Sequence, residues 1–538
     1  MECEADMRQF NNAGPTVPKK HYSLDPLKRI NLEEILGHIK EERYFVLHAP
    51  RQTGKTTCLL ALMRHLNAEG HYRAVYANVE GAQTARNNVE SGMRAIISTI
   101  AAQIDISTGD KTFLGRVGKL VDEYGANGVL QQVLREWTQS DPARPTVLML
   151  DEIDALVGDT LISVLRQIRS GYADRPEHFP TSVILCGVRD VRDYRIHSGG
   201  GEIITGGSAF NIKAASLVLG NFSRDDIRNL YAQHTEETGQ QFEEPIYDKL
   251  WDDTAGQPWL VNALGQILCF DMPKGRERSR PITLELYQQA REKLISSRVT
   301  HLDQLTDKLK EERVHRVIAK ILGGETDIET VPLDDLQYVQ DMGLLTLERP
   351  LKISNAIYRE IIPRELTWTT QQLTIYEETP WYVKEDKTLD TPKLLRSFQQ
   401  FFRENAEAWI EQFQYKEAGP QLLLQAFLQR IVNGGGRITR EYGLGMKRID
   451  LYLEWPLDEK LAFLGPLQRI VLELKILRKG LEATLAEGLS QTAGYARTCG
   501  ADEAHLIIFN RTGEKSWDDR IWERTEMCNG RAIQVWGM

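Results

Sequence analysis

The 538-residue sequence lacks the marks of several protein classes. No apolar run approaches the ~20 residues that a membrane helix needs, and the first twenty residues lack the apolar core of a secretory signal. No two cysteines form a CxxC pair, which argues against a zinc site and against a disulfide scaffold. We therefore expect a cytoplasmic protein that makes no membrane contact. The six cysteines are Cys3, Cys58, Cys186, Cys269, Cys499 and Cys528.

An excess of positive charge is also absent. Lysine and arginine number 66 against 76 aspartates and glutamates, and the formal net charge is −10. This balance argues against a general nucleic-acid binder. It leaves room for a local basic groove, because phosphate binding depends on where the positive charge lies. A chain of 538 residues is too long for one hydrophobic core, and we expect three or four domains.

Changes in hydrophobic periodicity divide the chain into segments. Short apolar runs (YFVLHAP, RAVYANV, TVLMLDE and SVILCGV) alternate with amphipathic stretches, which predicts a parallel α/β sheet. Ser223, followed by an acidic first turn, predicts the start of a helical region. Later helices precede GLLTLERPLKIS, two extended runs around a proline, which suggests a winged helix. The predicted multidomain α/β chain has a lead-in (1–30), a parallel-sheet core (31–220), a helical lid (221–299), a winged helix (300–366), a linker (367–392) and a second α/β domain (393–538).

A phosphate-binding loop follows the first predicted strand directly. Gly54-Lys55-Thr56 lies between that strand and the apolar helix CLLALMRHL, which is the context that a Walker A motif requires. Backbone N–H groups at a helix N-terminus bind phosphate, Lys55 would bridge the β- and γ-phosphates, and Thr56 would hold Mg²⁺. The first glycine of the motif is replaced by Ala49. The nucleotide-binding residues are predicted to be Pro50, Arg51, Gln52, Thr53, Gly54, Lys55, Thr56 and Thr57.

Two acids at the end of a buried strand complete this site. Val147-Leu148-Met149-Leu150 runs into Asp151-Glu152, the arrangement of a Walker B motif. Asp151 is expected to orient Mg²⁺, and Glu152 to polarise the attacking water as the catalytic residue. The predicted cofactors are therefore ATP and Mg²⁺.

Two further positions carry weaker signals. Arg189 ends the SVILCGV strand and either senses the γ-phosphate or a neighbouring subunit, or belongs to a solvated basic turn. Pro258, in Gly256-Gln257-Pro258, either contacts nucleotide from the lid or only breaks a helix.

These motifs give residues 31–365 a family resemblance. HAPRQTGKTT, LDEID, the Gly-x-Pro element and the closing SNAIYREIIPREL together resemble prokaryotic AAA+/STAND-type ATPases related to origin-recognition proteins. The resemblance implies an ATPase core, a helical lid and a winged helix. The missing first Walker A glycine also occurs within that group.

A second set of charged residues lies near the C-terminus. Asp450 falls in the predicted strand RIDLYLEW, and Glu473 and Lys475 fall in RIVLELKIL. Strand alternation puts Glu473 and Lys475 on one face. Because a proline-bounded turn separates the two strands, both carboxylates should lie side by side as ligands for Mg²⁺, with the lysine ready to position water.

The second set resembles the PD-(D/E)XK nuclease superfamily, in particular its RecB-like branch, over residues 393–538. The resemblance makes Asp450 and Glu473 metal ligands and Lys475 the catalytic lysine. Glu417 matches an additional metal-binding acid on the first helix. Gln491 and Tyr495, in LSQTAGYA, match the Q-x-x-x-Y element that supports the site and contacts DNA. The usual Pro-Asp pair is replaced here by Ile-Asp.

Local positive charge accompanies this second site. It either follows a phosphate backbone or covers a solvated hairpin. The cationic residues are Arg430, Arg437, Arg440, Lys447 and Arg448.

The preferred interpretation is an ATPase with a Mg²⁺-dependent endo- or exonuclease domain, acting on DNA in defence or mobile-element biology. A homo-oligomer is a candidate assembly. RNA is an alternative substrate. Two other interpretations stay open: a STAND-like signalling switch with a nuclease effector, and an ATP-dependent nucleic-acid binder whose nuclease fold is inactive.

Overall fold

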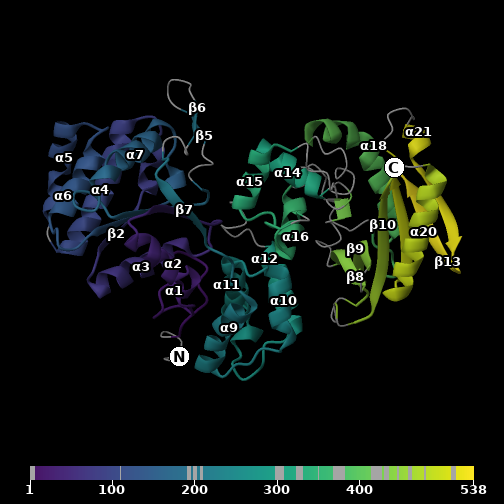
Figure 1. The fold of residues 1–538 in the computed structure, drawn as a ribbon. Coiled ribbons are helices and arrows are strands. Elements are labelled where there is room, and N and C mark those ends of the chain that lie inside the picture. Colours follow the sequence, from purple (N-terminus) through teal and green to yellow (C-terminus); the bar gives the residue numbers. More distant parts are fainter. Residues whose placement is uncertain are drawn as a thin grey trace. The chain divides into compact units, whose positions relative to one another are not determined.

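The computed structural model describes most of the chain in two compact units (Figure 1). The first comprises Met1–His301 and Pro332–Ile357, and the second comprises Leu302–Val331 and Tyr358–Met538. The described residues are 7–109, 111–190, 195–197, 203–205, 210–296, 308–309, 311–322, 331–348, 351–366, 382–413, 424, 427–428, 436–444, 447–458, 463, 465–477, 480–510 and 517–538.

The first unit is built on a five-stranded parallel sheet with the order β2-β3-β4-β1-β7. Its strands are β1 (Tyr44–His48), β2 (Arg73–Asn78), β3 (Thr146–Asp151), β4 (Ser182–Gly187) and β7 (Lys213–Val218). The four strands predicted from apolar runs are confirmed. The sequence analysis did not predict β7, because this edge strand is only partly buried and has no continuous apolar run. A short hairpin pairs β5 (Arg195–His197) with β6 (Ile203–Thr205).

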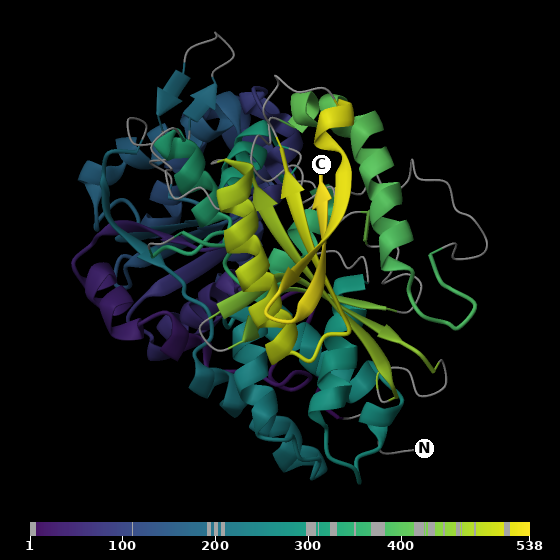
Figure 2. The same ribbon diagram turned by 90° about the vertical axis from the view of Figure 1, so that its right-hand side faces the viewer.

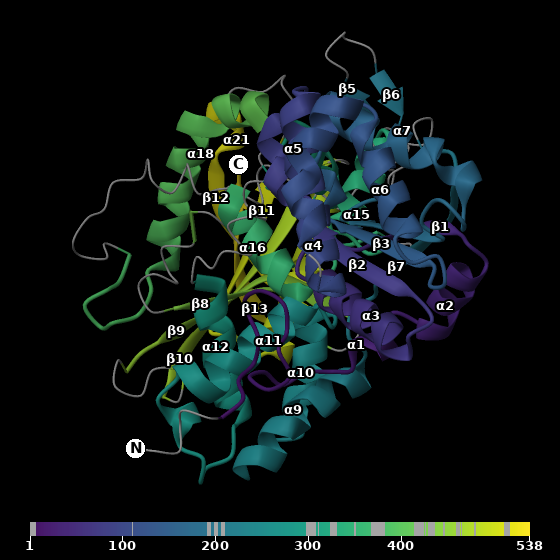
Figure 3. The same cartoon turned by 90° about the vertical axis from the view of Figure 1, so that its left-hand side faces the viewer.

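Helices cover both faces of this sheet, as a parallel sheet requires. Alternate residues of β1 divide between two cores: Phe45 and Leu47 pack with α2 and α3, whereas Tyr44 and Val46 face the core shared by α4 to α7. Figure 3 shows α4, α5 and α6 over their side of the sheet. The helices are α1 (Pro26–Arg29), α2 (Leu32–Lys40), α3 (Lys55–Glu69), α4 (Val89–Thr108), α5 (Thr112–Tyr124), α6 (Val129–Gln139) and α7 (Gly158–Ser170).

Helices follow the sheet in the region expected to be the lid, which keeps that name below. Ser223 begins it with a capping box in which its side chain and that of Asp226 bond each other's backbone, as the acidic first turn predicted. Residues 7–23, here called the N-terminal arm, pack on this lid with Phe10 only 2% exposed. The lead-in is therefore part of the folded unit rather than a polar extension. The lid helices are α9 (Arg224–Thr238), α10 (Pro245–Thr254), α11 (Pro258–Gln266) and α12 (Leu284–Ser296).

The region expected to be a winged helix contains α14 (Glu312–Leu322), α15 (Leu333–Asp341) and α16 (Ala356–Leu366). An antiparallel bridge between Leu345 and Ile353 forms the start of the expected hairpin. The division between the two units runs through this region, with α15 and the bridge in the first unit and α14 in the second. Its assignment as a winged helix stays a prediction.

The second unit contains a six-stranded mixed sheet, order β12-β13-β11-β10-β9-β8. The helices α20 and α18 pack on its opposite faces, in two separate cores. Figure 2 shows them as the yellow-green and green helices on either side of the strands. The elements are α18 (Thr391–Phe413), β8 (Arg437–Leu444), β9 (Lys447–Pro456), β10 (Leu467–Ile476), α20 (Leu481–Thr498), β11 (Glu503–Phe509), α21 (Trp517–Arg520), β12 (Trp522–Cys528) and β13 (Arg531–Gly537).

Two features of the second unit differ from expectation. Part of the expected linker belongs to this unit, because Tyr382 and Leu389 are buried in its core and Thr391 already begins α18. The strands β12 and β13 were not predicted, since β12 alternates between partly buried and exposed residues and resembles a polar loop. No helix in the described part of the chain is both long and apolar enough to cross a bilayer.

Candidate functional site

The loop between β1 and α3 has the backbone of a phosphate-binding nest. Gln52 and Gly54 both have positive φ angles, 59° and 94°, and Thr53 Oγ1 donates to the carbonyl oxygen of Pro50 over 2.9 Å. A loop of this shape at a helix N-terminus directs backbone N–H groups toward an anion. The predicted Walker A residues are therefore arranged around a single concave loop.

The Lys55 side chain bonds the backbone of this same loop. Its Nζ donates to the carbonyl oxygens of Ala49 and Pro50 over 2.9 and 3.0 Å, and the residue is only 6% exposed. Carbonyl oxygens neutralise an ammonium group only partly, so phosphate oxygens would be stronger partners for the same protons.

Asp151 ends β3 beside the start of α3 and is fully buried. Its carboxylate accepts hydrogen bonds from Thr56 Oγ1 (2.7 Å) and Tyr76 Oη (2.9 Å). The predicted Walker A and Walker B residues thus meet, although 95 positions separate Thr56 from Asp151. Tyr76, on β2, was not predicted as a site residue. Burial, followed by the charge of Asp151, raises the pKa of its phenol.

Glu152 follows Asp151 in a left-handed conformation with φ 58°. Burial raises the pKa of its carboxyl, and the charge of Asp154 adds to the effect. Asp154 itself accepts from the backbone N–H of Val188, over 3.1 Å. A carboxylate with a raised pKa at the end of the Walker B strand is a better proton acceptor than an ordinary glutamate.

Arg189, the predicted sensor, pairs with an acid outside the ATPase core. Its Nε lies 3.2 Å from Asp341 Oδ2, with side chains 11% and 4% exposed. Its guanidinium carbon lies 4.9 Å from the centre of the Tyr338 ring. A Cβ at Gly343 would lie 2.8 Å from Pro50 Cγ, so the end of α15 also approaches the Walker A loop. Asp341 lies in none of the sequence motifs and was not predicted as a site residue.

The Gly-x-Pro element lies at the start of α11. Gly256 has φ 70°, and a Cβ there would lie only 2.0 Å from the Phe222 carbonyl oxygen. Pro258 is buried in the first turn. The N-terminal arm connects this helix to the Walker A helix, because Asn12 accepts from Trp259 Nε1 over 2.9 Å and the Thr16 N–H donates to Thr57 Oγ1 over 3.0 Å.

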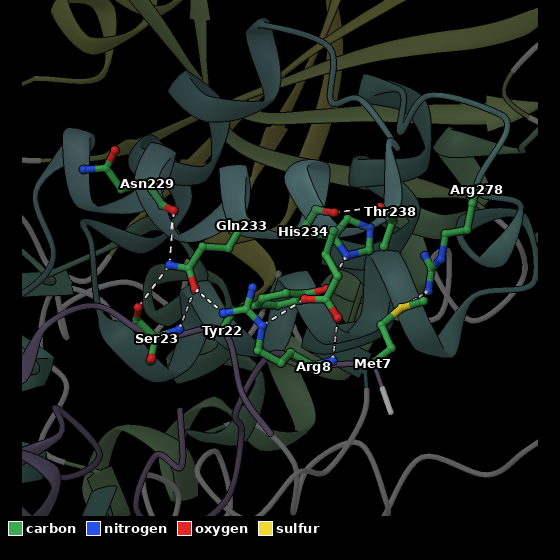
Figure 4. A network of polar contacts seen from close by, with 10 residues as sticks. Met7, Arg8, Tyr22, Ser23, Asn229, Gln233, His234, Thr238 and Arg278 are labelled. Atoms are coloured by element: carbon green, nitrogen blue, oxygen red, sulfur yellow. Dashed lines mark hydrogen bonds and ion pairs between the residues drawn. The ribbon is translucent and has the colours of Figure 1, made fainter. Parts of the chain in front are cut away.

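A polar network with a buried histidine at its centre holds the arm on the lid (Figure 4). His234 Nδ1 lies 3.1 Å from Tyr22 Oη, and its Nε2 lies 3.0 Å from Gln240 Oε1. Arg8 Nε pairs with Glu237 over 2.9 Å. Burial lowers the pKa of His234 to about 4.

The second unit brings together the residues predicted for its own site. The antiparallel register of β9 and β10 pairs Leu451 with Leu472, one residue from Asp450 and Glu473. Asp450 Oδ2 accepts from the Leu474 N–H over 2.8 Å, and Lys475 Nζ donates to Glu473 Oε1 over 3.0 Å. Asp450 and Glu473 therefore come from neighbouring strands to one place.

Glu473 is a buried carboxylate beside a second acid and a lysine. It is 3% exposed, and its Oε2 has no hydrogen-bond partner among the described residues. Burial, followed by the charge of Asp450, raises the pKa of Glu473 to about 7. Burying a carboxylate oxygen without a partner costs about 1–3 kcal/mol or more, which a bound cation would offset.

Other predicted residues of this site lie on α20 or outside the described residues. Burial raises the pKa of Tyr495, with Glu473 as the next cause. Gln491 lies one turn earlier on α20 and is partly buried. Glu417 lies outside the described residues, and these contain no group of three or more His, Cys, Asp or Glu that could hold a metal ion.

Of the predicted basic strip, the structure describes one side chain, that of Arg437. Arg437 lies 3.6 Å from Glu454 and stacks on Phe463 with its guanidinium carbon 4.2 Å from the ring centre. The strip's remaining side chains, those of Arg430, Arg440, Lys447 and Arg448, lie outside the described part.

Comparison with known proteins identifies part of the chain. Residues 38–194 match the family model described as an AAA domain. No curated protein matches the chain. Similar solved structures include a Walker-type ATPase of Pyrococcus abyssi (13% identity, 66% of this chain, 99% of that one, TM-score 0.43). They also include the RuvB Holliday junction branch migration motor of Thermotoga maritima (13%, 63%, 93%, 0.33) and Cdc6p of Pyrobaculum aerophilum (14%, 67%, 98%, 0.35). At these TM-scores, no property of those proteins is carried over to this chain.

Proposed function

We propose that this chain, whose residues 38–194 form an AAA-type P-loop ATPase domain, hydrolyses ATP and carries a Mg²⁺-dependent nuclease in its second unit. The observation that supports hydrolysis most directly is the hydrogen bond between Thr56 and Asp151, beside Lys55 and Glu152. Around this bond lie a lysine that can bind phosphate, two oxygen ligands for Mg²⁺ and a carboxylate that can accept a proton.

Each of these residues has a separate task in the proposed reaction. Lys55 exchanges its carbonyl partners for phosphate oxygens, and Glu152 accepts the proton of the attacking water. Thr56 and Asp151 fit a Mg²⁺ site because both present oxygen atoms, the ligands that this cation prefers. Bound Mg²⁺ neutralises phosphate charge when it accompanies ATP.

The test of hydrolysis is Lys55→Ala. The rate of phosphate release should fall about 100-fold or more, because the lost ammonium stabilises charge that develops in the transition state. The thermal unfolding temperature without nucleotide should stay near that of wild type. Lys119→Ala, on the exposed surface of α5, is the matched control and should keep full activity. Wild-type turnover in Lys55→Ala would contradict the assignment.

The nuclease proposal depends on the convergence of Asp450, Glu473 and Lys475. The unsatisfied Glu473 Oε2 fits a divalent cation held with Asp450. A bound Mg²⁺ supplies a Lewis acid for a phosphodiester oxygen. Lys475 orients the attacking water, and Tyr495 and Gln491 support the site from α20. The proposed substrate is DNA, with RNA as the alternative.

Cleavage assays separate an active nuclease from an inactive fold. The purified chain is incubated with plasmid DNA, single-stranded DNA and RNA, with and without Mg²⁺. Glu473→Gln should abolish cleavage and leave ATP hydrolysis unchanged, whereas Glu482→Gln, exposed on α20, should behave as wild type. Equal cleavage by wild type and Glu473→Gln would contradict the site. Mg²⁺-independent DNA binding without cleavage would instead support the nucleic-acid binder.

The buried pair of Arg189 and Asp341 favours a second candidate, a STAND-like switch. A sensor arginine held by another segment suits a protein that waits for a trigger, as in defence or mobile-element biology. Nucleotide-dependent assembly into a homo-oligomer, measured by light scattering with ADP and with a non-hydrolysable ATP analogue, tests this candidate. An unchanged mass in both states would contradict it.

A further inference from the structure

Arg29, at the end of α1, contacts the Walker A loop from outside the predicted motif. Its Nη1 donates to the carbonyl oxygen of Thr53 over 2.8 Å, and its Nη2 donates to the carbonyl oxygen of Gly220 over 2.9 Å. Thr53 belongs to the phosphate-binding loop, and Gly220 lies between β7 and the lid. One planar guanidinium therefore connects the loop to the place where the lid begins.

The loop is shaped to admit this side chain. A Cβ at Gly54 would lie 2.8 Å from Arg29 Nη1. Gly54 is thus required both for its positive φ and for the space that the guanidinium occupies. In the described part of the chain, the Arg29 guanidinium donates to the backbone carbonyls of Thr53 and Gly220, which fix its position.

The same side chain contacts the residue that bonds the Gly-x-Pro element. The guanidinium carbon of Arg29 lies 4.7 Å from the centre of the Phe222 ring. The backbone N–H of Phe222 donates to the carbonyl oxygen of Gly256 over 2.8 Å. A continuous path of contacts therefore runs from Thr53 through Arg29 and Phe222 to Gly256, at the start of α11.

We propose that Arg29 is a positioning residue that couples the lid to the Walker A loop, so that both close on one nucleotide together. This inference rests on the proposed ATP site. Arg29 does not touch the reacting atoms; it holds the Thr53 carbonyl and thereby the direction of the N–H groups that follow it. Its loss weakens nucleotide binding and the coupling of the lid to the loop, although the N-terminal arm still connects α11 to α3. Lys55 and Glu152 remain able to act on ATP that does bind.

Three variants test the proposal in the full chain. Arg29→Ala removes both hydrogen bonds. Arg29→Lys keeps the charge but cannot reach both carbonyls as a planar fork does. Lys28→Ala, the exposed neighbour on α1, is the matched control. Thermal unfolding without nucleotide checks that each variant folds, and Arg29→Lys carries the test if Arg29→Ala does not fold.

The first measurement separates KM from kcat. Arg29→Ala should raise KM for ATP on the order of tenfold to hundredfold, the range for loss of a hydrogen bond to a charged group. Its kcat at saturating ATP should remain within about threefold of wild type, since the transition-state contacts persist. Arg29→Lys should fall between the two, and Lys28→Ala should match wild type.

The second measurement is hydrogen–deuterium exchange with and without ATP. In wild type, ATP should slow exchange in both the Walker A loop and residues 256–266. In Arg29→Ala at saturating ATP, the loop should still be protected, whereas the protection of residues 256–266 should be smaller than in wild type. Equal protection of the lid in this variant, or a KM like that of wild type, would overturn the coupling. Absence of ATP binding by wild type would instead overturn the proposed function.

Discussion

Acid should loosen the N-terminal arm from the lid through His234. This side chain is fully buried against Tyr22 and Gln240, and burial lowers its pKa from 6.5 to about 4. The hydrogen bond to Gln240 raises this pKa in part, the charge of Arg278 lowers it, and the charge of Glu237 raises it to a lesser degree. In the folded state the ring therefore stays neutral until the pH approaches 4.

The sign and size follow from proton linkage. Between pH 6.5 and 4 the unfolded chain binds the proton and the folded chain does not, so stability falls as the pH falls. For those two pKa values, lowering the pH from 7.5 to 5 removes about 2 kcal/mol, approaching about 3 kcal/mol near pH 4. Stability from this group is fully present above its unfolded pKa.

The assay compares thermal unfolding at pH 7.5 and pH 5 in wild type, His234→Gln and His71→Gln. Glutamine stays neutral at both pH values and can still bond Tyr22, so His234→Gln should lose less stability on acidification than wild type. A difference of about 2 kcal/mol corresponds to a few degrees in a domain of this size. His71 is exposed, and His71→Gln should follow wild type. The same acid sensitivity in wild type and His234→Gln would refute the reasoning.

Three further substitutions are predicted to have distinct effects. Glu152→Gln should still bind a fluorescent ATP analogue but release phosphate about 100-fold more slowly, because the proton acceptor is lost; loss of binding would contradict its role. Asp341→Asn leaves the Arg189 guanidinium without its buried carboxylate, which should lower stability by about 3 kcal/mol and raise basal ATP hydrolysis; unchanged hydrolysis would argue against a restraining contact. Gly256→Ala forces a Cβ against the Phe222 carbonyl oxygen at positive φ. The free energy of unfolding should fall by about 1–3 kcal/mol, and with it the unfolding temperature; an unchanged temperature would show that the lid can adapt.

The parts of the structure that sequence could predict are those with local signals. Four strands of the first sheet are continuous apolar runs, and the Walker A loop follows one of them directly. Alternation within β10 put Glu473 and Lys475 on one face, and their side chains are bonded to each other in the structure. In both cases the spacing of a few residues determines the geometry, and no distant contact has to be known.

The residues that sequence did not indicate act through distant contacts. Tyr76 reaches Asp151 only because β2 lies beside β3. Nothing in the local sequence distinguishes Asp341 from the other acids; only the fold places it, at the end of α15, beside Arg189. The polar N-terminal arm conceals Phe10 and Tyr22, two isolated aromatic residues whose burial depends on the lid. No spacing rule identifies partners separated by dozens to hundreds of positions.

The positions of these contacts suggest how chemistry and control are divided in the first unit. Lys55, Asp151 and Glu152 lie within residues 38–194, the segment matched by the AAA-domain model. Arg29 contacts Thr53 of the Walker A loop, and Asp341 contacts Arg189, both from outside that segment. Substitutions of the proposed catalytic groups should therefore act mainly on turnover, whereas substitutions at the outer contacts should alter affinity or the resting rate. The KM and kcat values of Arg29→Ala and Asp341→Asn, set beside those of Glu152→Gln, test this division directly. A lower kcat with unchanged KM in both outer variants would show that the flanking segments belong to the catalytic machinery.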